Sequence, residues 1–378
     1  MFVWSFIPML RFEEGHNYCY NKTVGNACQI NSWQHRAIVP KSCEIENIPH
    51  NWQKVLFDDF FVEKENKFIQ KTFLEKLKVL LKSLSPLIKQ IKKINSHHKD
   101  NILFMEQFFL RQIISFGLAI FFVGPKAQVW LLHRYSSKQM GMKAKIYNFI
   151  HKLIEIRCGK DNLKLLCDSD LLSEDLSKVF KREVQVMPIP HTEDVICEEV
   201  NHNNLKKILW WPGAFTTKAK GLDIIQELCQ KKSDQFCLMV ASTAEENLQH
   251  SSLDILFLPH HLSRNDYIKN MQKADLILLP YDPKVYHFST SGIFVEAIVF
   301  GKIPLVHKDT WMAYELEKHD LTKLIINFDA PNIFEIFEDV LNDQDIRSKL
   351  LALKKKYKDF HSEGGFAKKM ALIANKIS

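Results

Sequence analysis

A row of hydroxyl side chains in front of an apolar helix is the first feature of the sequence that could do chemistry. Ser289, Thr290 and Ser291 stand together, and the apolar run that begins at Gly292 predicts a helix. The first N–H groups of a helix lack partners within it and favour an anion, and the hydroxyls add donors. Glu296 lies one to two turns further on, where a buried carboxylate needs a partner. The pattern suits a phosphate with a ribose diol, or equally a helix cap with a glutamate–lysine pair.

A second segment of suitable composition follows the strand expected over Lys207–Trp210. Gly213 lets the backbone turn without a Cβ clash. Lys218 and Lys220 can each reach a diphosphate as point charges. An ordinary strand-to-helix loop with exposed lysines would have the same sequence. The segment therefore indicates a phosphate site only when it is taken together with the segment Ser289–Glu296.

The tripeptide Asp168-Ser169-Asp170 matches the pattern by which one transferase architecture binds a metal ion. It follows a strand expected in the first half of the chain, away from the phosphate-binding segments. We interpret it as a turn and helix cap, and we expect no metal at the site.

The elements that must position these residues follow from alternating short apolar runs and helical patterns, which predict βα units and parallel sheets. The expected strands are Phe2–Ile7, Ala37–Val39, Ile102–Met105, Val129–Leu132, Lys164–Cys167, Glu183–Met187, Lys207–Trp210, Phe236–Val240, Leu253–Leu258, Leu276–Leu279, Ile303–Val306 and Leu324–Ile326. In a doubly wound sheet, ligands bind beyond the carboxyl ends of the strands.

The pattern predicts an α/β fold with two doubly wound, Rossmann-like domains over residues 1–195 and 205–350. The polar stretch His191–Asn204 suits a linker between them. A helix over Arg347–Ser378, broken at Gly364-Gly365, is expected to pack back toward the N-terminal domain from residue 351 to 378.

Length and charge limit the class of protein. A chain of 378 residues is long for one core, and its formal net charge of +7 would suit nucleic acid, anionic lipid or phosphorylated small molecules. No aromatic–basic interleaving supports nucleic-acid binding. The eight cysteines form no CxxC pair, and the first residues do not read as a signal peptide, so we expect reduced thiols and a cytoplasmic location.

The segment Phe61–Ile94 combines nine lysines with Leu, Ile and Phe, and Ser83–Pro86 is expected to break it. It reads either as a solvated helix face or as a basic amphipathic surface for peripheral contact with the inner face of an anionic membrane.

The stretch Leu262–Val306 resembles the nucleotide-sugar half of retaining glycosyltransferases, family 4 and its relatives. The tyrosine-rich approach to Ser291-Gly292, followed by Glu296-Ala297 and by the Gly-Lys-x-Pro motif at 301–304, carries the resemblance, which extends over about Leu205–Val306. It implies the GT-B architecture, with two Rossmann-like domains facing a cleft. It also implies a nucleoside-diphosphate sugar as donor, retained anomeric configuration and no required cofactor.

By that resemblance Lys220, beside Gly213, would hold the diphosphate and Glu296 the ribose, while Ser291 and Gly292 would cradle phosphate. Two positions depart from the family pattern. Phe288 stands where the family often has a glutamate that touches the sugar, and Lys218 would replace an arginine near the diphosphate lysine.

In the acceptor half, family 4 enzymes usually place a histidine after a strand, near the transferred sugar. His133 matches that placement and Glu106 is a second candidate; either could equally be a structural residue at a strand end. The acceptor itself, whether glycan, lipid or protein, is not specified. Alternatives are a sugar-nucleotide epimerase or an inverting transferase on the same fold, or a catalytically silent binding protein.

Overall fold

Seven strands of the first domain form one parallel sheet in the order β3-β2-β1-β4-β5-β6-β7. Their bounds are β1 Phe2–Phe6, β2 Gln34–Pro40, β3 Trp52–Leu56, β4 Asn101–Glu106, β5 Ala127–Leu132, β6 Leu163–Cys167 and β7 Val184–Val186. The structure, a computed structural model, describes residues 1–13, 16–57, 73–97, 100–189, 206–213 and 217–375. Residues 1–191 and 363–378 make up the first domain, and residues 192–362 the second. The linker expected over 191–204 lies outside the described residues.

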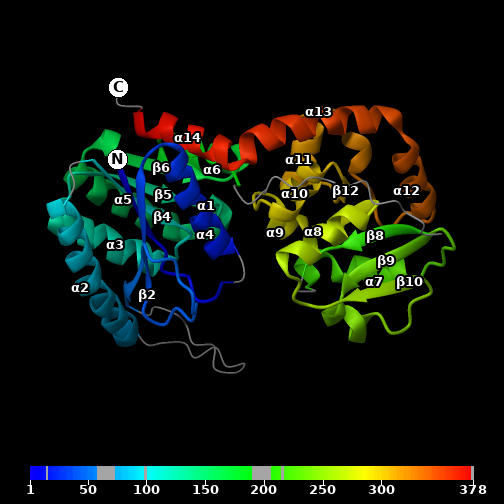
Figure 1. Cartoon of the computed structure of the whole chain (residues 1–378), viewed down its shortest axis with the longest axis horizontal. Helices are drawn as coiled ribbons and strands as arrows, with labels where there is room; N and C mark the ends of the chain where they lie inside the picture. Colours follow the sequence, from blue (N-terminus) through cyan, green and yellow to red (C-terminus); the bar gives the residue numbers. More distant parts are fainter. Residues whose placement is uncertain (14–15, 58–72, 98–99, 190–205, 214–216, 376–378) are drawn as a thin grey trace. The chain divides into compact units, whose positions relative to one another are not determined.

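Helices cover both faces of the first sheet (Figure 1). They are α1 His16–Ile30, α2 Phe73–His97, α3 Leu110–Val123, α4 Ser137–Met140, α5 Ala144–Cys158, α6 Asp170–Phe180 and α14 Glu363–Asn375, with 3₁₀ turns η1 Gly141–Lys143 and η2 Lys160–Asn162. α3 packs against both α2 and α5, and α1 packs against α14. Because the chain moves from β1 to β2 in one direction and from β4 to β6 in the other, right-handed crossovers place α1 on the opposite face from α3 and α5.

The last helix belongs to the core of the first domain, although it is far from the other elements in sequence. Phe366 is fully buried and its ring meets that of Tyr20 edge-on, with centroids 5.6 Å apart. The Asn31 amide donates to the Ala367 carbonyl oxygen at 2.8 Å. The helix expected over 347–378 is therefore two helices, and the turn between them lies at Ser362, two residues before the expected glycines.

The second domain has a five-stranded parallel sheet in the order β10-β9-β8-β11-β12. Its strands are β8 Lys207–Trp211, β9 Phe236–Ala241, β10 Asp254–Leu258, β11 Leu276–Leu279 and β12 Ile303–Val306. Its helices are α7 Leu222–Cys229, α8 Arg264–Lys273, α9 Pro283–Tyr286, α10 Gly292–Phe300, α11 Trp311–Glu317, α12 Ile333–Asn342 and α13 Gln344–His361, with 3₁₀ turns η3 Lys218–Lys220, η4 Ser242–Asn247 and η5 Thr322–Leu324. The predicted α/β class with two doubly wound domains is confirmed.

Two strand predictions differ from the structure for local reasons. β3 was not expected, because the polar Gln53 and Lys54 interrupt its apolar pattern; it is an edge strand that buries only its ends, Trp52 and Leu56. The strand expected over Leu324–Ile326 is instead the end of η5, and Ile325 makes only an isolated bridge to Val306.

The break expected at Ser83–Pro86 is absent, because α2 runs through Pro86. Ser83 donates to the Leu80 carbonyl oxygen and shares a hydrogen bond of 2.8 Å with Ser115 of α3. Packing against α3 therefore outweighs the loss of one helical hydrogen bond at proline. The α2 lysines at 78, 82, 89, 92 and 93 are exposed, and residues 61–72 of the expected basic segment lie outside the described residues. Of the described helices, none combines the length and apolar composition that crossing a bilayer requires.

Replacing Phe366 with alanine should lower the free energy of unfolding by about 3–5 kcal/mol, because the change leaves a cavity in the first-domain core. Leu372→Ala on the same helix is the matched control, since that side chain is 57% exposed; its effect should stay within about 0.5 kcal/mol. Urea unfolding of the two variants measures the difference. Equal effects would contradict the docking of α14 in this core.

Candidate functional site

The second sheet reverses its strand order beside β8, which lies between β9 and β11. The chain leaves β8 for β9 on one side and later returns to β11 on the other, where Leu276 pairs with Leu209. Loops that leave the carboxyl ends of two such strands run in opposite directions, and the space between them is where open α/β sheets bind ligands. The segments at 212–221 and 280–292 are those two loops.

Two glycines let the loop after β8 approach its surroundings closely. Gly213 has φ +131°, and a Cβ added there would lie 3.0 Å from the Lys220 Nζ. Gly221 has φ +87°, and a Cβ there would lie 2.2 Å from the Pro280 carbonyl oxygen. Any side chain at Gly221 would therefore push the loops after β8 and β11 apart. The indole N–H of Trp211 donates to the Lys220 carbonyl oxygen at 3.0 Å and fixes the backbone of that residue.

The two predicted diphosphate lysines have different environments. Lys220 is half-buried, and burial lowers the pKa of its ammonium group. Among the described residues its ammonium has no hydrogen-bond or ion-pair partner. The Lys218 side chain is 82% exposed and its Nζ lies 3.3 Å from an Asp223 carboxylate oxygen. A desolvated cation without a counter-ion gains most from a bound anion, so Lys220 is the better phosphate-binding candidate.

The start of α10 lies on the neighbouring loop. Ser291 is buried and caps the helix, since its hydroxyl accepts a hydrogen bond of 3.3 Å from the Phe294 N–H. Ser291 also shares a hydrogen bond with Tyr281, whose pKa is raised mainly by burial. One residue further, the Asp282 N–H donates to the Ala219 carbonyl oxygen at 3.0 Å and ties this loop to η3.

These contacts bring the predicted phosphate-binding residues of the second domain to one edge of its sheet. Ser289 and Thr290 are half-buried just before the Ser291 cap, and Gly292 is the first residue of α10. The nine residues of α10 therefore begin on the loop that is bonded to the lysine loop.

Glu296 has partners that the sequence interpretation missed. Its carboxylate is buried; Oε1 lies 2.7 Å from an Arg264 guanidinium nitrogen, and Oε2 accepts a hydrogen bond of 2.8 Å from the Tyr267 hydroxyl. Burial, and then the Glu296 charge, raise the pKa of Tyr267. The spacing of Arg264 and Tyr267 on one face of α8, after the Ser263 cap, was the available signal. A carboxylate has about four acceptor sites, so these two donors do not by themselves exhaust its capacity to accept hydrogen bonds.

Phe288 follows α9 and provides no polar group at the position where the family often has a glutamate. Its half-buried ring lies edge-on to that of His287, with centroids 4.6 Å apart. The His287 Nδ1 lies 2.9 Å from the Asp309 carbonyl oxygen.

In the first domain, Arg134 joins the ends of three neighbouring strands. Its guanidinium lies 2.7 Å from the Glu106 carboxylate at the end of β4 and also pairs with Asp168 after β6. Burial acts to lower the pKa of Arg134, but Asp168 and Glu106 outweigh it and raise that pKa. The Asn21 amide donates to the second Glu106 oxygen at 3.0 Å. Glu106 therefore pairs with a half-buried arginine, a role that the sequence did not indicate.

The interpretation of the Asp168-Ser169-Asp170 tripeptide as a turn and helix cap is confirmed. Ser169 accepts a hydrogen bond of 3.2 Å from the Leu172 N–H at the start of α6. Asp168 is the partner of Arg134.

His133 follows β5 as expected, but its side chain is only 2% exposed. Its ring centroid lies 5.0 Å from that of Phe108, 5.2 Å from that of His151 and 5.0 Å from that of Phe180. Burial lowers the pKa of His133 to about 3, so the imidazole is neutral. Its Nε2 has no hydrogen-bond partner among the described residues. An anomeric-centre role for His133 stays a prediction, and the observed surroundings are those of an aromatic core.

No family model and no curated protein matches the chain. Solved structures are similar to it over almost its full length. The N-terminal domain of Candida albicans trehalose-6-phosphate phosphatase matches with a TM-score of 0.67 and 12% identity, covering 98% of this chain and 96% of that one. Anabaena HepE in complex with UDP and glucose matches with a TM-score of 0.64 and 11% identity over 98% of both chains.

An alpha-glucosyltransferase in complex with UDP and a DNA 13-mer matches with a TM-score of 0.60 and 11% identity, covering 99% of this chain and all of the other. At these identities the similarity shows the fold. With its two doubly wound parallel sheets, the chain has the GT-B fold.

The buried neutral state of His133 predicts a pH dependence of stability. Between a pKa of about 3 in the folded chain and 6.5 in the unfolded chain, only the unfolded chain binds the proton. Stability is therefore full above pH 6.5 and is lost as the pH falls toward 3. His133→Phe should remove about 2 kcal/mol of the loss between pH 6.5 and about pH 5.

Urea unfolding of wild type and variant at several pH values measures this difference. His151 keeps its own lowered pKa in the variant, so part of the acid sensitivity should remain. His250→Phe is the control, because that side chain is exposed, and its profile should follow that of wild type. A His133→Phe profile parallel to wild type would contradict the assignment.

Proposed function

We propose that the chain is a glycosyltransferase that moves a sugar from a nucleoside-diphosphate sugar to an acceptor. The observation that carries the proposal is Lys220, a half-buried ammonium without a partner among the described residues, at the point where the second sheet reverses its strand order. The same loop is bonded to the loop from which α10 begins. One edge therefore offers a cation, the N-terminus of α10 and a buried carboxylate for the diphosphate and the ribose.

In this proposal the second domain stabilises the leaving group. As the bond between the sugar and the diphosphate breaks, negative charge grows on the diphosphate, and Lys220 with the first N–H groups of α10 would bind that charge. These groups can neutralise a diphosphate without a metal ion. Retention of anomeric configuration and membership of family 4 are part of the proposal and rest on the sequence resemblance.

Uridine is the first base to test, because HepE and the alpha-glucosyltransferase are described in complexes with UDP. The acceptor, whether glycan, lipid or protein, is open. Contact with an anionic membrane through the basic 61–94 segment remains a prediction; Lys78, Lys82, Lys89, Lys92 and Lys93 of that segment are exposed.

A catalytically silent binding protein is the second candidate, and Phe288 favours it. A phenylalanine cannot accept hydrogen bonds from sugar hydroxyls at that position. The two candidates share nucleotide binding and differ in turnover. Release of UDP from UDP-sugars in the presence of acceptor mixtures would support the transferase, and nucleotide binding without any turnover would support the silent protein.

Lys220→Ala should weaken UDP binding about tenfold or more and leave uridine binding nearly unchanged, because the ammonium contacts only the diphosphate. Lys218→Ala is the matched control, since Lys218 is exposed and paired with Asp223; its effect should be much smaller. Calorimetric titration with both ligands measures the ratio. An equal loss for UDP and uridine would contradict the diphosphate assignment.

Glu296→Gln should weaken UDP binding roughly tenfold, because hydrogen bonds between a diol and a charged carboxylate are lost. Binding of 2′,3′-dideoxy-UDP should change little, since that ligand lacks the diol. Tyr267→Phe is the control: it removes one partner of Glu296 but keeps the carboxylate, so the preference for the diol should persist. If the Glu296→Gln variant still prefers UDP over the dideoxy compound as wild type does, the ribose assignment is wrong.

A further inference from the structure

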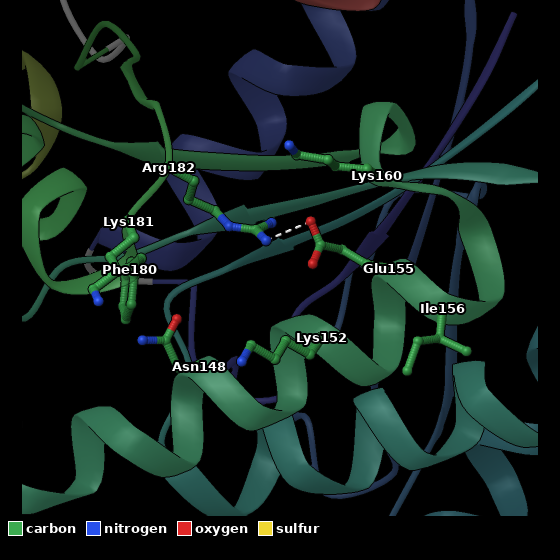
Figure 2. Close-up of a pocket in the computed structure, with 8 residues that line it drawn as sticks. All are labelled: Asn148, Lys152, Glu155, Ile156, Lys160, Phe180, Lys181 and Arg182. Carbon is green, nitrogen blue, oxygen red and sulfur yellow. Dashed lines mark ion pairs between the residues drawn. The ribbon is translucent and has the colours of Figure 1, made fainter.

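A hollow on the first domain lies at the amino ends of β6 and β7. It has a volume of about 640 Å³ and is formed by α5, by the turn η2 that precedes β6, and by the segment 180–182 that precedes β7 (Figure 2). Glu106 and Asp168 mark the carboxyl ends of β4 and β6, so the hollow lies at the opposite edge of the same sheet. None of the candidate catalytic or donor-binding residues lines it.

The lining of the hollow is strongly basic. Four cations stand around it with one carboxylate: Lys152, Lys160, Lys181 and Arg182 with Glu155. Figure 2 shows the Arg182–Glu155 ion pair with the lysine side chains around it. The three lysines have no ion-pair partner among the described residues. Like charges gathered on a concave surface repel one another, and an anion in the hollow would relieve that repulsion.

The remaining lining groups suit a ligand that has uncharged polar and apolar parts as well as a charged group. Asn148 donates its amide to the Val179 carbonyl oxygen at 3.0 Å, which fixes the side chain and leaves its own oxygen as an acceptor. Phe180 and Ile156 supply apolar surface. The Arg182 Nε is buried and makes no hydrogen bond within the described residues, so Glu155 satisfies this guanidinium only in part.

Lys181 is held in the left-handed region, with φ +52°, where it ends α6. Its N–H donates to the Ser177 carbonyl oxygen. Glycine is the usual residue at this position of a helix end, because a Cβ is unfavourable there. A lysine therefore carries a conformational cost that a glycine would avoid, and what it adds is an ammonium group at the hollow.

We propose that this hollow is a second ligand site, which binds a phosphate-bearing anion separately from the donor nucleotide. Lysines act as point charges for phosphate oxygens and the arginine supplies a planar fork. The volume is within the range of small-molecule sites and exceeds what inorganic phosphate fills. The ligand is thus a phosphate ester with a polar body that can meet Asn148.

Two sources can supply this chemistry. One is a soluble phosphate monoester. The other is a phospholipid head group, because the same helix and the turn before it expose Met142 (90%), Phe149 (58%) and Ile156 (71%), which a lipid surface could cover. The site and its charges are the same in both cases, and the experiment separates the sources.

The test titrates the full chain with glucose 6-phosphate by calorimetry, and with vesicles of phosphatidylcholine alone or mixed with phosphatidylglycerol by co-sedimentation. The double variant Lys152→Glu with Lys160→Glu reverses two exposed charges of the hollow. Lys143→Glu with Lys145→Glu makes the same change in net charge at exposed positions of η1 and α5 outside it. Lys220→Ala removes the proposed donor-site cation.

Wild type should bind the monoester or the anionic vesicles, and the hollow variant should bind that probe about tenfold more weakly or not at all. The Lys143/Lys145 and Lys220 variants should bind as wild type does. Binding of the monoester assigns a soluble ligand; binding of anionic vesicles alone assigns a lipid head group. The proposal is overturned if wild type binds neither probe, if the hollow variant binds normally, or if the Lys143/Lys145 variant loses as much affinity. It is also overturned if Lys220→Ala abolishes the binding, since the probe would then occupy the donor site.

Discussion

The parallel pairing of β8 with β11 is the interaction on which the proposed donor site depends. These strands are far apart in sequence, and Leu276 pairs with Leu209 where the sheet reverses its order. Their loops meet so closely that Gly221 lies against the Pro280 carbonyl oxygen. Through this contact, Lys220 on one loop and the start of α10 on the other share one edge of the sheet. Without that pairing they would be unrelated polar residues.

Among the charged groups near the candidate sites, some are paired with an opposite charge and others are not. The paired groups stabilise the fold, and the unpaired cations are available to bind an anion. In the first domain Arg134 pairs with Glu106 and Asp168, and in the second Arg264 pairs with Glu296. Burying such charges is tolerable because they are paired. Lys220 is partly desolvated without a described partner, and the lysines of the basic hollow have none either. Unpaired cations, half-buried at Lys220 and gathered around a basic hollow in the first domain, indicate where an anion would bind.

The strands with continuous apolar runs were predictable because burial on both faces of a parallel sheet demands such runs. β3 could not be predicted from its apolar pattern because, as an edge strand, it buries only Trp52 and Leu56. The sequence predicted a break at Pro86, but the packing of α2 on α3 stabilises the helix by more than the proline costs. Local propensity is a weak prior wherever two elements bury a large shared surface.

The sequence by itself determined the α/β class, the two-domain organisation and the residues that follow each strand, since these depend on local apolar patterns and chain order. The identity of the partners was decided only by the tertiary structure. His133 and Glu106 have the right types and positions for chemistry, yet one lies among aromatic rings and the other holds Arg134. The basic hollow unites residues 148–160 with 180–182, which no sequence motif connects. Burial and charge pairing depend on neighbours from distant segments, and strand order alone brings those together.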